Sequence, residues 1–169
     1  GRGFGMHRWL LLGPPRSGSN MHIDPGGTSA WNTLLVGCKR WVLFDPNTPE
    51  EAIKSPEMLA NTTANANSNS QAGTDAGGNG TYDLGAAGWF HTVLPRIERQ
   101  VQDGDWAALG YSAPVHVVQK AGETIMVPAG WWHVVLNLDC TVCVTQNFAA
   151  PMHYPKVAAA TYGEASTRP

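Results

Sequence analysis

The chain has 169 residues, a length that suits a single domain with a substantial buried core. Hydrophobic residues make up 43% of it and charged residues 14%, a balance typical of a globular protein with many strands and loops. The net charge is -2 at pH 7 and no run of Lys or Arg occurs, so the sequence has no direct signal of nucleic-acid binding. No apolar run approaches the roughly 20 residues of a membrane span, and no signal peptide opens the chain.

The cysteines indicate a reducing, intracellular compartment, because three is an odd number and does not suit a secreted disulfide framework. Cys140 and Cys143 have the spacing of redox and zinc motifs. Residues three apart in a strand face opposite sides, and no second cysteine pair exists to complete a site, so we expect structural thiols. The chain begins Gly1-Arg2-Gly3 without Met, which is typical of a fragment.

The first predicted strand is the apolar run of residues 8–12, which Gly13-Pro14-Pro15 closes with a turn. We expect this strand to be buried. Residues 16–20 are predicted to be a loop that leads into His22-Ile23-Asp24. Pro25-Gly26-Gly27 then breaks the extended stretch, as expected where a strand end carries ligands.

His22 and Asp24 point to the same face of a strand, because strand side chains alternate. Two such groups, with a third donor from elsewhere, form the 2-His-1-carboxylate face of non-haem Fe(II) oxygenases. A single His-x-Asp triplet is a weak indication of a metal, since surface loops contain it by chance. The interpretation therefore depends on a third ligand.

Residues 38–44 are predicted to be the next strand, and alternation places Lys39, Trp41 and Leu43 on one face. A Lys among large apolar groups normally extends its ammonium to water. If Lys39 points inward instead, it requires an anion as its partner.

A short helix is predicted to run from Thr48 to about Leu59, with Thr48 as N-cap, Pro49 at the first position and Glu51 completing a capping box. Residues 61–88 are rich in Asn, Ala, Gly, Ser and Thr and nearly lack large apolar side chains, so a disordered insertion is predicted. The expected organisation is one domain over residues 1–169, with this insertion and a tail over 154–169.

Closely spaced strands are predicted in the second half of the chain. They cover residues 115–119, 124–127, 133–138 and 141–148. Short strands separated by Gly and Pro turns indicate an all-β sandwich or barrel.

His133 is the natural third ligand, because it opens a strand directly after the rigid turn and bulky rings of residues 128–132. A core His bonded to backbone is the common alternative for any single His. Thr145 and Asn147 share one face of the last strand. That face is equally consistent with exposure to solvent and with the polar wall of a pocket.

Several motifs, in order, resemble the JmjC (Jumonji C) oxygenases, closest to the phosphatidylserine-receptor-like branch of lysyl hydroxylases and arginine demethylases. The resemblance covers roughly residues 8–41 and 115–148. The motifs are Gly13-Pro14-Pro15-Arg16-Ser17-Gly18, His22-Ile23-Asp24-Pro25, Thr28-Ser29-Ala30-Trp31-Asn32, Lys39-Arg40-Trp41, Gly122-Glu123-Thr124 and residues 128–137 and 145–148.

The resemblance implies a double-stranded β-helix, a cupin-like jelly roll, that binds Fe(II) through His22, Asp24 and His133. It also implies 2-oxoglutarate as co-substrate and O2 as oxidant. Lys39 would pair with the distal carboxylate of 2-oxoglutarate, and Thr145 would hydrogen-bond the same end. Asn32 and Asn147 fall where the family has further polar groups of the pocket.

The resemblance further implies a protein substrate, histone or splicing-related, and a nuclear location. Hydroxylation of lysine side chains is the first expectation, and the enzymatic alternative is N-methyl-arginine or N-methyl-lysine demethylation. A rival of another class is a catalytically silent, cupin-like metal-binding module. The intact set of His22, Asp24, His133 and Lys39 argues against a silent module.

Overall fold

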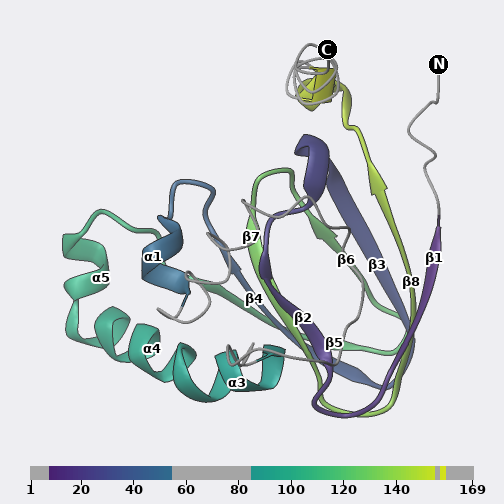
Figure 1. The fold of residues 1–169 in the computed structure, drawn as a ribbon, viewed down its shortest axis with the longest axis horizontal. Helices are drawn as coiled ribbons and strands as arrows, with labels where there is room; N and C mark the ends of the chain where they lie inside the picture. Colours follow the sequence, from purple (N-terminus) through teal and green to yellow (C-terminus); the bar gives the residue numbers. More distant parts are fainter. Residues whose placement is uncertain (1–7, 55–84, 155–156, 159–169) are drawn as a thin grey trace, which may run out of the picture.

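A computed structural model describes residues 8–54, 85–154 and 157–158. The strands in these ranges form two four-stranded sheets that face each other (Figure 1), and every pairing within them is antiparallel. The predicted all-β double-stranded β-helix is therefore confirmed. None of the described helices is long and apolar enough to cross a membrane.

Each sheet is assembled from strands that are distant in sequence. Sheet A consists, in spatial order, of β1 (Trp9–Gly13), β8 (Thr141–Phe148), β3 (Ser29–Val36) and β6 (Thr124–Val127). Sheet B consists of β2 (Gly18–His22), β7 (Trp132–Asn137), β4 (Cys38–Phe44) and β5 (Val115–Lys120). The strands predicted over residues 8–12, 38–44 and 115–148 occur within one residue at each end. The prediction that His22 and Asp24 share a strand is wrong, because β2 occupies most of the stretch predicted to be a loop and ends at His22, and Asp24 lies in the turn that follows.

The inner face of sheet B carries the residues that alternation predicted. In register, Lys39, Trp41 and Leu43 of β4 lie opposite Asn137, Val135 and His133 of β7. Trp41 and Leu43 pack in one cluster with Val127 of sheet A, so this face points toward the other sheet. Lys39 therefore points inward, and its side chain is only 6% exposed.

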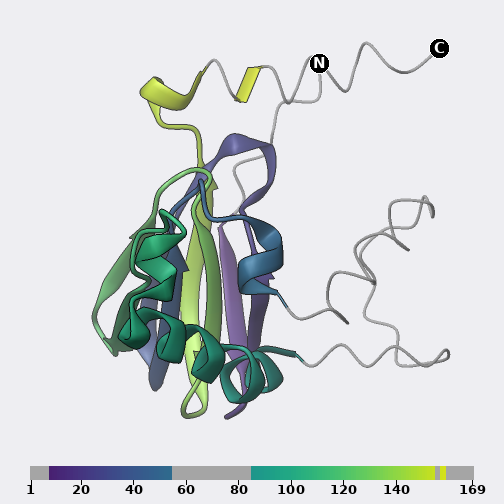
Figure 2. The same cartoon turned by 90° about the vertical axis from the view of Figure 1, so that its left-hand side faces the viewer.

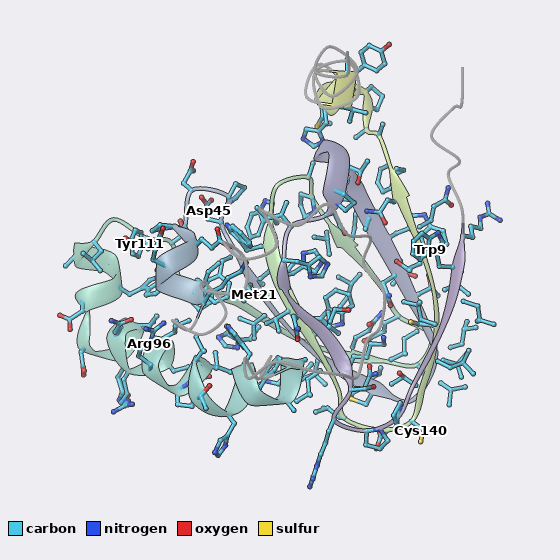
Figure 3. The ribbon with its side chains drawn as sticks, in the orientation of Figure 1. Trp9, Met21, Asp45, Arg96, Tyr111 and Cys140 are labelled. Carbon is cyan, nitrogen blue, oxygen red and sulfur yellow. The ribbon has the colours of Figure 1, made fainter. Side chains whose placement is uncertain are left out.

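Helices cover the outer face of sheet B (Figure 2). They are α1 (Glu50–Ile53), α3 (Gly85–Thr92), α4 (Leu94–Asp103) and α5 (Asp105–Ala108), and the 3-10 turns η1 (Pro25–Gly27) and η2 (Pro151–His153) lie elsewhere. A core forms where Val42 and Phe44 of β4 meet Trp89 and Trp106 of the helices. Met21 of β2 also points toward this helical layer (Figure 3).

Three of these helices were not predicted. Leu94, Ile97 and Val101 recur at the spacing of one helix face, and all three pack against the core, so a periodic signal was present. Residues 85–88, predicted to end the insertion, begin α3 instead, because Ala86 and Trp89 are buried by packing on sheet B. Residues 61–84 and most of the tail lie outside the described residues.

The predicted cap of α1 is wrong. The helix begins at Glu50 with Pro49 as N-cap, and no side chain caps it. Thr48 lies one residue too early, because its backbone N–H already donates to the carbonyl of Asp45 in a preceding turn. The helix ends at Ile53, and residues 55–59 of the predicted helix lie outside the described residues.

The prediction that the first strand is buried is also wrong. β1 forms one edge of sheet A, where Trp9 is labelled in Figure 3. Trp9 and Leu10 are each 60% exposed. The helices of the described chain cover sheet B only, so Leu10, on the outward face of β1, meets no covering element. Trp9 shares the face of Thr145 and is exposed at the edge of the sheet. Strand propensity predicted the element correctly but says nothing about which sheet the helices cover.

Candidate metal centre

His22 and His133 lie directly opposite each other where β2 pairs with β7. Ser19 of β2 lies opposite Val135, so three steps along β2 match two steps along β7. This β-bulge matters because alternation alone would place residues three apart on opposite faces. The extra residue lets Ser19 and His22 both share the inner face, and it brings the His22 ring to His133.

Asp24 lies just beyond the end of β2, at the N-cap position of η1. Pro25 ends the strand pairing, so the chain turns and brings the carboxylate back toward the two imidazoles. One ligand atom from each of His22, Asp24 and His133 lies within 4.8 Å of the others. The His22 Nε2 atom is 3.9 Å from Asp24 Oδ1, and the two imidazole centroids are 4.1 Å apart.

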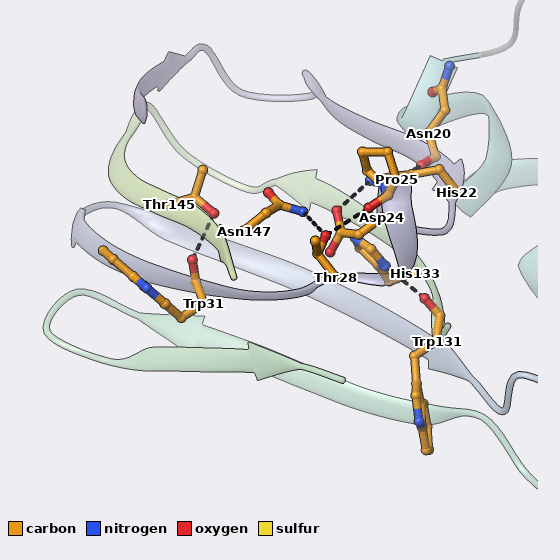
Figure 4. A network of polar contacts seen from close by, with 10 residues as sticks. All are labelled: Asn20, His22, Asp24, Pro25, Thr28, Trp31, Trp131, His133, Thr145 and Asn147. Atoms are coloured by element: carbon orange, nitrogen blue, oxygen red, sulfur yellow. Dashed lines mark hydrogen bonds and ion pairs between the residues drawn. The ribbon is translucent and has the colours of Figure 1, made fainter. Parts of the chain in front are cut away.

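The same nitrogen of each imidazole is engaged by backbone (Figure 4). The Nδ1 atom of His22 is 2.6 Å from the carbonyl oxygen of Asn20, and that of His133 is 3.1 Å from the carbonyl oxygen of Trp131. A carbonyl can only accept, so each Nδ1 donates and each Nε2 keeps its lone pair. Such hydrogen bonds set the tautomer and orientation of metal-binding histidines.

Burial, together with the nearby imidazole of His22, lowers the pKa of His133 to about 4. The hydrogen bond to the Trp131 carbonyl and the carboxylate of Asp24 partly oppose this shift. His133 is therefore neutral near pH 7. The neutral imidazole is the form that coordinates a metal ion.

The donor set fits a metal ion of the Fe(II) class. Asp24 Oδ2 is buried and has no hydrogen-bond partner, which is costly for a carboxylate oxygen unless a ligand satisfies it. Two imidazoles and one carboxylate on one face leave further coordination positions open. The site can hold a metal and still admit small ligands to it.

A cavity of about 320 Å³ opens beside Lys39, between the β1–β2 turn and the inner face of sheet B. Its polar lining comes from Ser17, Ser19, Lys39, Asn137 and Thr141, and Leu11, Leu12 and Val135 add apolar walls. Lys39 forms no hydrogen bond or ion pair with the residues that the structure describes, although its side chain is buried. Such an ammonium requires an anion.

Comparison with known proteins agrees with this geometry. The family model described as "Cupin-like domain" matches residues 6–154. The bifunctional arginine demethylase and lysyl-hydroxylase psr-1 of Caenorhabditis briggsae is 40% identical over 85% of this chain and 30% of its own length. The arginine-specific demethylase JMJ22 of Arabidopsis thaliana is 34% identical over 85% of this chain and 23% of its own length.

The 2-oxoglutarate and iron-dependent oxygenase JMJD4 of Homo sapiens is 29% identical over 84% of this chain and 27% of its own length. The chain belongs to the family of proteins with a cupin-like domain, and it is similar to relatives named as 2-oxoglutarate and iron-dependent oxygenases. The resemblance to the JmjC oxygenases is thereby confirmed. The chain spans less than a third of the length of these curated relatives.

The other polar residues predicted for the site lie on sheet A. Asn32 lies opposite Thr145 in register, and both face inward. Thr145 Oγ1 donates to the carbonyl of Trp31 at 2.8 Å, and Asn147 Nδ2 donates to Thr28 Oγ1 at 3.1 Å (Figure 4). Neither Thr145 nor Asn147 is exposed, and Asn32 on the neighbouring strand is buried.

The cavity beside Lys39 is lined by other residues. Its lining, among the described residues, does not include Asn32, Thr145 or Asn147. Asn137 does line it and was given no role from the sequence. The signal was its position, because a residue four after His133 in one strand shares the face of His133.

Proposed function

We propose that this oxygenase hydroxylates protein side chains, most directly those of lysine, with Fe(II), 2-oxoglutarate and O2. One observation carries the proposal: three metal-ligand atoms lie within 4.8 Å of one another in a domain that also buries an unpaired lysine. A metal and an organic dianion satisfy both features. The single-domain organisation over residues 1–169 is part of this proposal.

His22, Asp24 and His133 would hold the iron. When bound, iron would supply activation of O2, so that one oxygen atom enters the substrate C–H bond and the other enters succinate, formed from 2-oxoglutarate with release of CO2. The chain contributes the orientation of the ligands, through the backbone carbonyls of Asn20 and Trp131. Trp41, whose ring stacks on that of His133 and is 4% exposed, excludes water from this side of the site.

Lys39 would hold the distal carboxylate of 2-oxoglutarate, because a charge-assisted hydrogen bond is what its buried ammonium lacks. Thr145 is proposed for the same end of the co-substrate, and Asn32 and Asn147 for the pocket wall. Asn32 supports this assignment, since its Oδ1 atom is buried without a hydrogen-bond partner. Thr145 and Asn147 would have to exchange their present acceptors, or use remaining lone pairs, to contact the ligand.

The second candidate reaction is demethylation of N-methyl-arginine or N-methyl-lysine. It is favoured by the relatives, which are named as an arginine demethylase and lysyl-hydroxylase and as an arginine-specific demethylase. The chemistry is the same, because hydroxylation of an N-methyl carbon leads to loss of the methyl group. A histone or splicing-related substrate and a nuclear location are proposed on family membership.

Mass spectrometry of a peptide panel separates these alternatives. The protein is incubated with Fe(II), 2-oxoglutarate and lysine, methyl-lysine and methyl-arginine peptides, with His133→Ala as the inactive control. Gain of one oxygen on lysine supports hydroxylation, and loss of a methyl group supports demethylation. Metal binding with no succinate above the His133→Ala background on any peptide would identify a silent binding module.

A further inference from the structure

Gln119 of β5 is completely buried, and its side chain makes three hydrogen bonds. Its Oε1 atom accepts from the indole Nε1 of Trp41 at 2.9 Å. Its Nε2 atom donates to the carbonyl of Asn32 at 2.9 Å and to that of Glu123 at 3.1 Å. Both N–H donors and one lone pair of this carboxamide are thus used in a buried region between the sheets.

The orientation of this amide is determined by its partners. A flipped carboxamide would place its NH2 group against the indole N–H of Trp41 and its oxygen against two carbonyl oxygens. Gln119 therefore has one acceptable orientation. In it, the side chain ties β4 of sheet B to β3 of sheet A, because Trp41 and Asn32 belong to different sheets.

Trp41 contacts both Gln119 and His133, so it links the buried carboxamide to the metal centre. Its ring stacks on His133, with centroids 6.2 Å apart and an interplanar angle of 24°. The backbone carbonyl of Trp131 restrains His133 at Nδ1, but a single hydrogen bond still allows the ring to tilt. The indole flanks one face of the imidazole, and its N–H is held by the Gln119 carboxamide.

We propose that Gln119 is a positioning residue: it holds Trp41 against His133 and so orients the Nε2 lone pair of His133 toward the metal. This inference rests on the proposed function for the identity of the site. The alternative is that Gln119 only fills the core between the sheets. The two roles predict different results. Substitution of a residue that only fills the core lowers stability, whereas substitution of a positioning residue also changes the metal centre.

The test uses Gln119→Met, which keeps the volume and removes the three hydrogen bonds, with Val42→Ala as the matched control. Val42 is completely buried on the opposite face of β4, in the core beneath the helices, so its truncation destabilises the same strand away from the metal centre. The first measurement is the dissociation constant for Co(II), with its visible absorption bands. The second is the ring-current shift of the His133 Cε1 proton in the metal-free protein.

Gln119→Met is expected to weaken Co(II) binding about tenfold, the lower end of the range for residues that orient metal ligands. It should also shift the Co(II) bands and reduce the ring-current shift, while Val42→Ala leaves all three within error. Trp41→Phe, which keeps a ring but removes the indole N–H, eliminates the same hydrogen bond from the Trp41 side. If Gln119→Met does not fold, Trp41→Phe is measured in its place.

A double-mutant cycle completes the test. If Gln119 acts through Trp41, adding Gln119→Met to Trp41→Phe changes Co(II) binding little further. Fully additive effects, or equal losses in Gln119→Met and Val42→Ala, would overturn the proposal. If the parent protein binds no Co(II), the proposed function fails, whereas the ring-current shift in the metal-free protein still decides the role of Gln119.

Discussion

Lys39 and Asn137 lie directly opposite each other across β4 and β7, on the inner face of sheet B. Both side chains are buried, at 6% and 5% exposure, and both line the cavity beside the β1–β2 turn. The Lys39 ammonium has no partner among the described residues, and the Oδ1 atom of Asn137 has none either. Burying unpaired polar groups costs free energy, and an anion bound in this cavity would offset that cost.

Lys39→Met is expected to raise the 2-oxoglutarate concentration for half-maximal succinate production about 10–100-fold, because a hydrogen bond to a charged group contributes roughly 1.5–3 kcal/mol. The iron requirement should change far less, since Lys39 is not among the metal-ligand atoms. The same substitution should raise the melting temperature of the ligand-free protein, because a buried, unpaired charge is removed. Steady-state kinetics and thermal unfolding measure the two effects.

Lys120→Met is the control, because Lys120 lies at the end of the neighbouring strand β5 and is exposed. It should leave both the kinetics and the melting temperature unchanged. Equal increases in the 2-oxoglutarate and iron requirements of Lys39→Met would count against a carboxylate-binding role.

His133→Ala and Asp24→Ala are each expected to abolish succinate production and to weaken Co(II) binding by more than the roughly 10–100-fold typical of outer-shell changes. Each removes one of the three ligand atoms that lie within 4.8 Å of one another. Isothermal titration calorimetry and a succinate assay make the measurement. His116→Ala, at an exposed histidine of β5, is the control, and unchanged turnover in His133→Ala would exclude the metal assignment.

The sheet elements could be predicted because their signals are local. Alternation and Gly or Pro turns predicted the strands, and the same alternation predicted that Lys39 shares a face with Trp41 and Leu43. The helices α3 to α5 were missed because they follow a stretch of low complexity. The exposure of β1 could not be predicted either, since burial depends on which sheet the helices cover.

The site could be predicted only in part, for a related reason. The types and spacing of His22, Asp24 and His133 indicated a metal centre, but the register of β2 on β7 is a long-range property. Because a bulge follows Ser19, strand periodicity alone does not predict which face of the sheet His22 occupies. The cross-sheet role of Gln119 left no local signal, because its partners lie on three other segments.

Arg16→Gly is expected to stabilise the protein by several tenths to about 1 kcal/mol. Arg16 has a φ of 69°, and it is the sole non-glycine residue with positive φ among those described. A left-handed conformation costs an L-residue roughly 1–2 kcal/mol, which glycine avoids, although glycine loses part of this gain through its freer unfolded state. Chemical denaturation measures the change. Arg16→Ala keeps the strain and should show no gain, so equal stabilisation by both substitutions would contradict the argument.

Gly18→Ala is expected to destabilise the fold and to weaken metal binding together. A Cβ atom at Gly18 would lie 1.9 Å from the carbonyl oxygen of Val135, so β2 would have to move away from β7. The pairing of His22 with His133 brings the two imidazoles together, and moving β2 away from β7 would disrupt this pairing. Overpacking typically costs roughly 1–3 kcal/mol, and a loss of Co(II) affinity should accompany it.

Gly110→Ala is the control for Gly18→Ala, because Gly110 has a φ of 80° but a Cβ atom added there would meet no described neighbour within 4 Å. It should cost stability through backbone strain alone, at a turn remote from the β2–β7 pairing, and leave Co(II) affinity unchanged. Denaturation curves and Co(II) titrations on both variants separate the two causes. If Gly18→Ala lost stability but kept full Co(II) affinity, the metal centre would not depend on the β2–β7 register.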